Sequence, residues 1–113
     1  MIDLIATAAI MLPQDRGFPV SRSQVARYSL NKKELRQIMK AAEWAKTRKA
    51  RSVVRCESGG NYHINTGNGN YGTWLGNGGG KYARYAHLAP KFAQDHIAWK
   101  TWKSRGWQPW ACA

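Results

Sequence analysis

Glu57 is the residue best suited to acid–base chemistry in a chain that contains 6 Asp+Glu. It follows the apolar pair Val53-Val54, and a carboxyl group in an apolar neighbourhood keeps its proton near neutral pH until a leaving group takes it. The alternative interpretation is a carboxylate paired with Arg51 or Arg55 at a helix end, which is the commoner use of a carboxylate beside arginines. The residues alone leave both interpretations open.

Cys56 and Cys112 can form a disulfide that encloses half of the chain. Closing such a loop removes conformational entropy from the unfolded chain and stabilises the fold by roughly 4 kcal/mol. The alternative is a pair of buried free thiols, as is usual in a cytosolic protein. A catalytic thiol is not expected, because only the neighbouring Arg55 would favour the thiolate of Cys56.

The remaining residues that could do chemistry form no pattern for a metal or a cofactor. His63, His87 and His96 lack the short pair spacing of zinc ligands, and the cysteines are not clustered. The glycine-rich stretches 67–69 and 78–80 are not followed by Lys-Ser or Lys-Thr, as a phosphate-binding loop requires. We therefore expect no metal site and no cofactor.

The composition describes one small, strongly basic domain. The 113 residues are 43% hydrophobic and 21% charged, which excludes a multidomain enzyme and a wholly disordered chain. The formal net charge of +12 indicates a polyanionic partner: nucleic acid, a membrane surface or an anionic cell wall. The apolar run Ile2–Leu12 is shorter than the roughly 20 residues of a membrane span. It also lacks the preceding basic segment of a clear signal peptide.

The elements that must position these residues are mainly helical. Residues 1–30 show no sustained periodicity and are predicted to be an arm or a loosely packed lead-in. Asn31 as a cap, Glu34 as its capping-box partner and an apolar stripe predict a helix over about Lys32–Arg48, with a basic opposite face. A second helix is expected over Ala50–Glu57, which places the glutamate in its last turn, before a glycine pair.

The C-terminal half is predicted to consist of turns followed by one more helix. Segment Gly59–Gly80 combines glycine with asparagine, which predicts turns and short hairpins, and its aromatic residues argue against a linker. The last helix is predicted with Pro90 as its first residue and Gly106 at its end, and Phe92 and His96 lie on one face of it. The tail then carries the second cysteine back toward the start of the domain.

Two motifs resemble one known family. The first is Cys56-Glu57-Ser58-Gly59-Gly60-Asn61-Tyr62 followed by Ile64-Asn65-Thr66-Gly67-Asn68-Gly69-Asn70-Tyr71-Gly72, and the second is Gly106-Trp107-Gln108-Pro109-Trp110-Ala111-Cys112. They are similar to the signature and the closing segment of the resuscitation-promoting factor or transglycosylase-like domain of actinobacteria and their phages. The likeness covers about residues 50–113.

The resemblance implies an α+β, mainly α fold: a small lysozyme-like domain with a short loop or hairpin region and one disulfide, Cys56–Cys112. We accordingly divide the chain into an N-terminal arm and basic amphipathic helix, residues 1–46, and a transglycosylase-like domain, residues 47–113. The family cleaves the β-1,4 bond between N-acetylmuramic acid and N-acetylglucosamine in peptidoglycan, and Glu57 matches its catalytic glutamate. The residues expected to contact the sugars are Tyr62, Asn65, Asn68, Tyr71, Thr73 and Trp74.

The family works with one essential carboxylate, and here Asp95 is the next acid downstream. In a lytic transglycosylase, Glu57 would protonate the glycosidic oxygen and then help the muramyl 6-hydroxyl close a 1,6-anhydro ring. Hydrolysis by a carboxylate pair would require a second acid. One departure is clear: Tyr71-Gly72 runs directly into Thr73-Trp74, where the family has an intervening segment that begins Gly-Leu-Gln-Phe. Part of the cleft wall, including a glutamine, is therefore absent, and for Trp74 core packing is an equally good interpretation.

The expected function is a peptidoglycan-cleaving glycosidase, either a lytic transglycosylase or a muramidase, that acts on glycan strands outside the cell, in the cell wall or from a phage virion. The N-terminal region is expected to contact other cell-wall or virion proteins. An alternative is a non-catalytic cell-wall-binding or virion structural component with a shortened cleft. A less favoured alternative is a basic nucleic-acid-binding protein, which would leave the cysteine pair and the Glu57 motif unexplained.

Overall fold

The structure is a computed structural model in which residues 18–113 are described. These residues form the helices α2 (Arg22–Arg27), α3 (Lys32–Ala45), α4 (Arg48–Ser58) and α5 (Lys91–Arg105) and the 3-10 helix η1 (Ala86–Leu88). Their isolated β-bridges pair Asn65 with Tyr71, Tyr71 with Gly76, and Gly79 with Ala83. The expected mainly helical fold with a small hairpin region is thus confirmed. The apolar run Ile2–Leu12 lies outside the described residues.

Helix α3 follows its sequence pattern closely. The Asn31 side chain accepts a hydrogen bond from the Glu34 N–H at 2.8 Å, and the Glu34 carboxylate accepts one from the Asn31 N–H at 3.0 Å, as in the predicted capping box. The buried residues of the helix are Leu35, Ile38, Ala41 and Trp44. This apolar stripe faces α5, so α3 packs along that helix.

A short connection ends α3 at Ala45, before the predicted end at Arg48. The early end is explained by Thr47, whose backbone is extended and cannot continue α3. Its hydroxyl accepts a hydrogen bond from the Ala50 N–H at 3.4 Å and so caps the start of α4. Helix α4 closes at Gly59, whose φ of 69° lies in the left-handed region that glycine adopts readily. The second predicted helix is therefore present, and its last turn carries the glutamate.

The lead-in before α3 contains a regular element, and the prediction of an arm without periodicity is wrong for this part of it. Helix α2 begins after Ser21, whose hydroxyl accepts a hydrogen bond from the Gln24 N–H at 3.2 Å. The helix buries Val25, which is 1% exposed. A helix of 6 residues cannot show a period in a window of about 11 residues, so its packing on α3 and α5 was not visible in the sequence.

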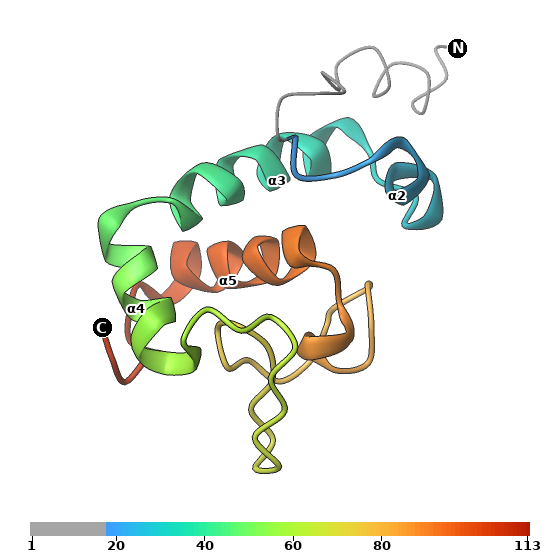
Figure 1. Ribbon diagram of the computed structural model, residues 1–113. Helices are drawn as coiled ribbons and strands as arrows, with labels where there is room; N and C mark the ends of the chain where they lie inside the picture. Colours follow the sequence, from blue (N-terminus) through green and yellow to red (C-terminus); the bar gives the residue numbers. More distant parts are fainter. Residues whose placement is uncertain (1–17) are drawn as a thin grey trace.

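Helices α3 and α5 lie side by side and run in the same direction, and α4 crosses the end of the fold near the C-terminus (Figure 1). Two apolar clusters fill the space between the elements. The aliphatic cluster joins α2, α3 and the start of α5, and its buried members are Val20, Val25, Leu30, Leu35, Ile38, Ala89, Phe92 and Ala93. The tryptophan cluster joins α3, α4, α5 and the tail, and its buried members are Trp44, Ala50, Val53, Trp74, Ala98 and Trp110.

Helix α5 is the central helix. Every residue from Phe92 to His96 is buried, which is typical of a helix that is covered on most of its circumference. Pro90 precedes this helix as its cap instead of forming its first turn, and Gly106 ends it as predicted. None of the helices within residues 18–113 is long and apolar enough to span a bilayer.

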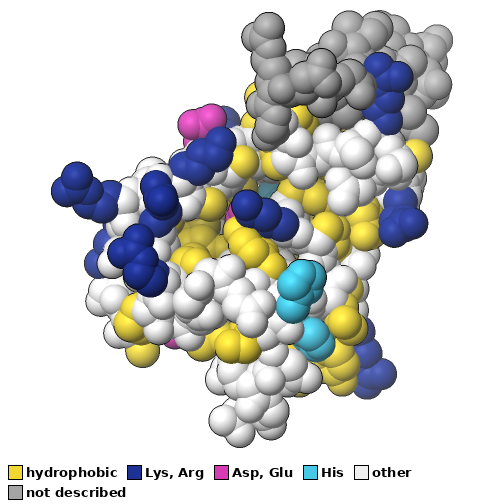
Figure 2. Space-filling model, in the orientation of Figure 1, with side chains coloured by type: hydrophobic (Ala, Val, Ile, Leu, Met, Phe, Trp, Pro, Cys, Tyr) yellow, Lys and Arg dark blue, Asp and Glu magenta, His cyan; other side chains and the backbone are white. Residues whose placement is uncertain are grey.

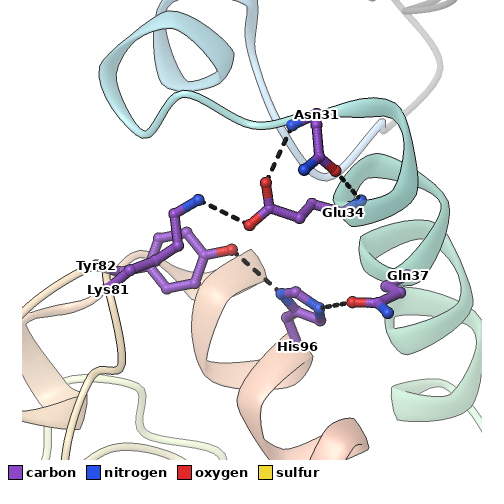
Figure 3. A network of polar contacts seen from close by, with 6 residues as sticks. All are labelled: Asn31, Glu34, Gln37, Lys81, Tyr82 and His96. Atoms are coloured by element: carbon purple, nitrogen blue, oxygen red, sulfur yellow. Dashed lines mark hydrogen bonds and ion pairs between the residues drawn. The ribbon is translucent and has the colours of Figure 1, made fainter.

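A polar network beside the aliphatic cluster ties α3 to α5 and to the loop before it (Figure 3). His96 contacts the Tyr82 hydroxyl through Nδ1 at 3.1 Å and the Gln37 side-chain oxygen through Nε2 at 3.0 Å. Lys81 Nζ lies 2.7 Å from Glu34 Oε2. Burial lowers the pKa of His96 to about 4, so the ring is neutral at neutral pH.

Candidate active site

Glu57 lies in the last turn of α4, and its side chain is half-buried. Its Oε2 atom accepts a hydrogen bond from the backbone N–H of Cys112 at 3.1 Å. The alternative interpretation, an ion pair with Arg51 or Arg55, is wrong, because no cation within residues 18–113 forms an ion pair with this glutamate. The tail therefore orients the carboxyl group through one of its two oxygens.

The disulfide between Cys56 and Cys112 brings the tail to α4. The sulfur atoms are bonded at 2.07 Å and the two residues are 56 positions apart, so the predicted pairing is confirmed and the free-thiol alternative is wrong. This bond places the Cys112 N–H beside the residue that follows Cys56. The orientation of the Glu57 carboxyl group thus depends on the folding of a distant segment.

Two polar side chains that the sequence analysis did not single out as site residues hold the loop 72–74 against α4 and α5. The Ser58 hydroxyl donates to the Thr73 carbonyl oxygen at 2.6 Å. Gln94 Oε1 accepts from the Thr73 N–H at 2.9 Å, and its amide donates to the Tyr62 carbonyl oxygen at 2.8 Å. Gly72 has a φ of 72°, in the left-handed region that favours glycine, and a Cβ atom there would lie 2.3 Å from Gln94 Oε1 and displace this side chain.

Asp95, the next acid along the chain after Glu57, is a buried anchor that is 5% exposed. Its Oδ1 atom accepts hydrogen bonds from the Tyr62 hydroxyl at 2.9 Å and from Trp74 Nε1 at 3.0 Å. Burial raises the pKa of the Asp95 carboxyl group, although these hydrogen bonds act in the opposite direction. Burial, reinforced by Asp95, also raises the pKa of the Tyr62 hydroxyl. Asp95 therefore positions two of the predicted sugar contacts.

Trp74 packs inside the tryptophan cluster. Its ring stacks on Trp44 with the centroids 4.6 Å apart, and its carbonyl oxygen accepts a hydrogen bond from Trp110 Nε1 at 3.0 Å. Trp74 is 5% exposed and the adjacent Thr73 is 0% exposed, so both residues pack in the core. Trp74 also borders a cavity of about 350 Å³ between the loop and α5. A sugar contact by these two residues stays a prediction.

The segment 65–71, closed by the bridge between Asn65 and Tyr71, forms the small hairpin that projects away from the helices (Figure 1), and Asn68 lies within it. Asn65 Oδ1 accepts a hydrogen bond from the backbone N–H of Gly67 at 2.9 Å, and the Asn68 side chain is exposed. The Tyr71 ring stacks on His87 with the centroids 4.9 Å apart. Asn65 and Asn68 are thus outside the buried group around Asp95, whereas Tyr71 lines the cavity of about 350 Å³ together with Trp74 and Gln94. Neither here nor elsewhere in residues 18–113 do three His, Cys, Asp or Glu side chains gather as metal ligands would.

Comparisons with known proteins identify the family of this domain. The profile of the transglycosylase-like domain matches residues 44–113. The chain is 42% identical over 69 residues to resuscitation-promoting factor Rpf1 of Corynebacterium glutamicum, and 46% identical over 66 residues to resuscitation-promoting factor RpfB of Mycolicibacterium smegmatis. These alignments cover 54% and 52% of this chain but only 36% and 18% of the two relatives. No solved structure matches the chain.

The matched region contains the elements that build the site: α4 with Glu57, the hairpin, α5 and the tail with Cys112. It spans more than half of the chain and includes both cysteines of the disulfide. The chain belongs to the transglycosylase-like domain family, a family of lysozyme-like cell-wall glycosidases.

Proposed function

We propose that this protein cleaves peptidoglycan glycan strands at the β-1,4 bond between N-acetylmuramic acid and N-acetylglucosamine, with Glu57 as the catalytic acid. The observation that carries the proposal is the arrangement of the Glu57 carboxyl group. One oxygen is held by the Cys112 N–H at 3.1 Å, and no cation of the described chain neutralises the group. A carboxyl group that is oriented but not engaged in an ion pair is suited to proton transfer.

The proposed reaction is that of a lytic transglycosylase. Glu57 protonates the glycosidic oxygen as the bond breaks, and the resulting carboxylate then accepts the proton of the muramyl 6-hydroxyl, which closes a 1,6-anhydro ring. This mechanism needs a single carboxyl group. The burial of Asp95 supports it, because both oxygens of Asp95 accept a hydrogen bond from the Tyr62 hydroxyl, and Oδ1 accepts another from Trp74. A hydrolase with paired carboxylates would need a second acid that faces the substrate.

The proposed sugar contacts differ in accessibility. Asn65 and Asn68 are exposed on the hairpin, so their side-chain amides can reach a bound glycan strand. Tyr62 and Tyr71 are half-buried, and because the buried Asp95 holds the Tyr62 hydroxyl, the proposed contact of Tyr62 is through its ring. Thr73 and Trp74 are buried, and their proposed contact requires a sugar to enter at the cavity that Trp74 borders. We further propose that the protein acts on the wall from outside the cell or from a virion, and that residues 1–46 contact other wall or virion proteins.

The test is mass spectrometry of the soluble products after purified actinobacterial peptidoglycan is incubated with the protein. Anhydro-muropeptides are expected, and Glu57→Gln should reduce their rate of release by at least about a hundredfold. The amide keeps an oxygen that can accept the Cys112 N–H, so the melting temperature should stay nearly unchanged. Glu43→Gln is the matched control, because it removes an exposed carboxylate from α3 and should leave the rate unchanged. A fully active Glu57→Gln variant would remove this mechanism, and reducing-end products would show a hydrolase.

A second candidate is a wall-binding domain without catalysis. It is favoured by the direct connection of Gly72 to Thr73, which closes the loop against Gln94 and leaves Thr73 0% exposed. In the same experiment this candidate predicts no soluble products from the wild type or the variant, while both proteins sediment with the wall.

A further inference from the structure

Lysine and arginine side chains gather over α4 and the adjoining end of α3 (Figure 2). Four of them, Lys46, Arg48, Arg51 and Arg55, together with Ser52 line a surface hollow of about 510 Å³. We call these four residues the cationic row. The catalytic proposal does not use it, since Glu57 forms no ion pair with any of its members.

The cations of the row are spaced along a line, as the binding of a linear charged ligand requires. Arg48, Arg51 and Arg55 are three and four residues apart on α4, so they lie on one face of the helix, at successive rises of about 5 Å and 6 Å. The three arginines thus extend over about 10 Å. A single phosphate ion is too small to contact all of these arginines, whereas a polymer with a charge in every repeat can contact each of them.

The row also lacks ion-pair partners among the described residues. Within residues 18–113 no carboxylate forms an ion pair with Lys46, Arg48, Arg51 or Arg55. Like charges three and four residues apart on a helix destabilise it slightly. An anionic ligand would remove this repulsion, so complementary charge favours binding.

A second hollow, of about 340 Å³, adjoins the row and supplies an apolar surface. Lys46, Arg51 and Arg55 line it together with Val54 and the rings of Tyr62 and Trp74. Lys91 also lines this hollow, and its ammonium group lies 5.3 Å from the centre of the Tyr62 ring. The combined surface therefore offers cations beside apolar side chains, which suits a chain in which phosphates alternate with polyol or sugar units.

We propose that the cationic row and the adjoining hollow bind a linear phosphodiester polymer of the cell wall. The choice of a wall polymer rests on the proposed function, which places the protein at the wall. Nucleic acid is disfavoured, because single-strand binders stack bases on accessible aromatic rings. Of the two aromatic residues that line the adjoining hollow, Trp74 stacks one ring face on Trp44, and Lys91 lies over the ring of Tyr62, so these ring faces are already occupied where a base would stack.

The test is binding of the full chain to poly(glycerol phosphate) in a salt titration, with a single-stranded oligonucleotide of equal phosphate number as the competing ligand. The variant is Arg51→Gln with Arg55→Gln, since both side chains are exposed. Lys32→Gln with Lys33→Gln is the matched control: it removes the same charge from exposed positions at the opposite end of α3. Circular dichroism and the melting temperature establish that both variants fold.

The arginine pair should weaken polymer binding by about tenfold at low salt and reduce the slope of log affinity against log salt by about one to two units, while the lysine pair changes both much less. Equal losses for the two pairs would overturn the proposal, because they would show a non-specific charge effect. Tighter binding of the oligonucleotide, with the same loss in the arginine pair, would overturn it in favour of nucleic acid. The adjoining hollow shares Tyr62 and Trp74 with the proposed sugar contacts, so Glu57→Gln separates the two proposals: it should lose glycan cleavage and still bind the polymer like the wild type.

Discussion

The aliphatic and tryptophan clusters are parts of one small domain, but they are assembled in different ways. The aliphatic cluster draws most of its members from residues 20–38 and adds the start of α5. The tryptophan cluster combines Trp44, Trp74 and Trp110, which are far apart in the chain, and the disulfide reinforces it. Local helices and caps therefore build the first region, whereas contacts between distant segments build the second.

This difference matters because Glu57 belongs to the second region. Its carboxyl group is oriented by the Cys112 N–H, and the loop after its helix is held by Ser58 and Gln94. A perturbation of the tryptophan cluster should therefore reduce stability and activity together. A perturbation of the aliphatic cluster should reduce stability while the site persists in the molecules that remain folded.

The largest effect is expected for Trp44→Ala, which removes the ring that stacks on Trp74. Truncating a buried tryptophan should lower the free energy of unfolding by up to about 5 kcal/mol, and we expect glycan cleavage to be lost with it. Trp44→Phe should cost less, because it keeps a ring and gives up an N–H that has no hydrogen-bond partner within the described chain. Urea unfolding followed by tryptophan fluorescence measures the free energy of unfolding of both variants, and the muropeptide assay measures their cleavage. Ile38→Val, expected to cost about 1 kcal/mol, is the comparison in the aliphatic cluster.

The next largest effect is expected for removal of the disulfide by Cys56→Ser with Cys112→Ser. Opening a loop of 56 positions should lower the free energy of unfolding by roughly 4 kcal/mol. Because the Cys112 N–H orients Glu57, cleavage should fall even under conditions where the variant is folded. Urea unfolding and the muropeptide assay test the two parts. Unchanged cleavage by the folded variant would show that the tail is not needed to hold the carboxyl group.

An acid-dependent effect is expected for His96, which lies beside the aliphatic cluster. Its pKa is lowered to about 4 in the folded protein, below the ordinary value near 6.5. The unfolded chain therefore takes up the proton first as the pH falls, and stability is lost between about pH 6.5 and pH 4. His96→Gln should reduce this slope of unfolding free energy against pH. His63→Gln, at an exposed position, is the control and should leave the slope unchanged.

The smallest effect is expected for Asn31→Ala, which removes the cap of α3. The free energy of unfolding should fall by about 1 kcal/mol. The cap lies at the end of α3 far from α4, so the cleavage rate of the folded variant should equal that of the wild type. Thermal unfolding together with the muropeptide assay checks the prediction. If the folded variant also lost cleavage activity, the aliphatic and tryptophan clusters would be energetically coupled, contrary to this prediction.

The helices were predictable where their signals are local. Asn31 with Glu34 identified the start of α3, and the glycines at positions 59 and 106 identified the ends of α4 and α5. Helix α2 was missed although Ser21 and Gln24 form a capping box, because its 6 residues are too few to show a repeated apolar pattern. The end of α3 was placed too late, because Thr47 starts the next helix.

The site was predictable in part. Glu57 and the cysteine pair stood out by residue type and by resemblance to a family, but the ion-pair alternative could only be tested by geometry. Gln94 and Asp95 were missed as structural anchors, because polar residues on a helix usually face solvent. The one available signal was the pattern of α5, where polar and apolar residues alternate too irregularly to define a single exposed face.

The sequence by itself determined the helix starts and stops, the position of Glu57 in a final turn, the cysteine pair and the excess positive charge. These properties depend on residue type and on hydrogen bonds between near neighbours in the chain. The tertiary structure decided that the Cys112 N–H holds Glu57, that Asp95 is buried against Tyr62 and Trp74, and that the cationic row lacks carboxylate partners in residues 18–113. Burial and partner choice depend on segments tens of residues away, and no local pattern encodes which of them meet.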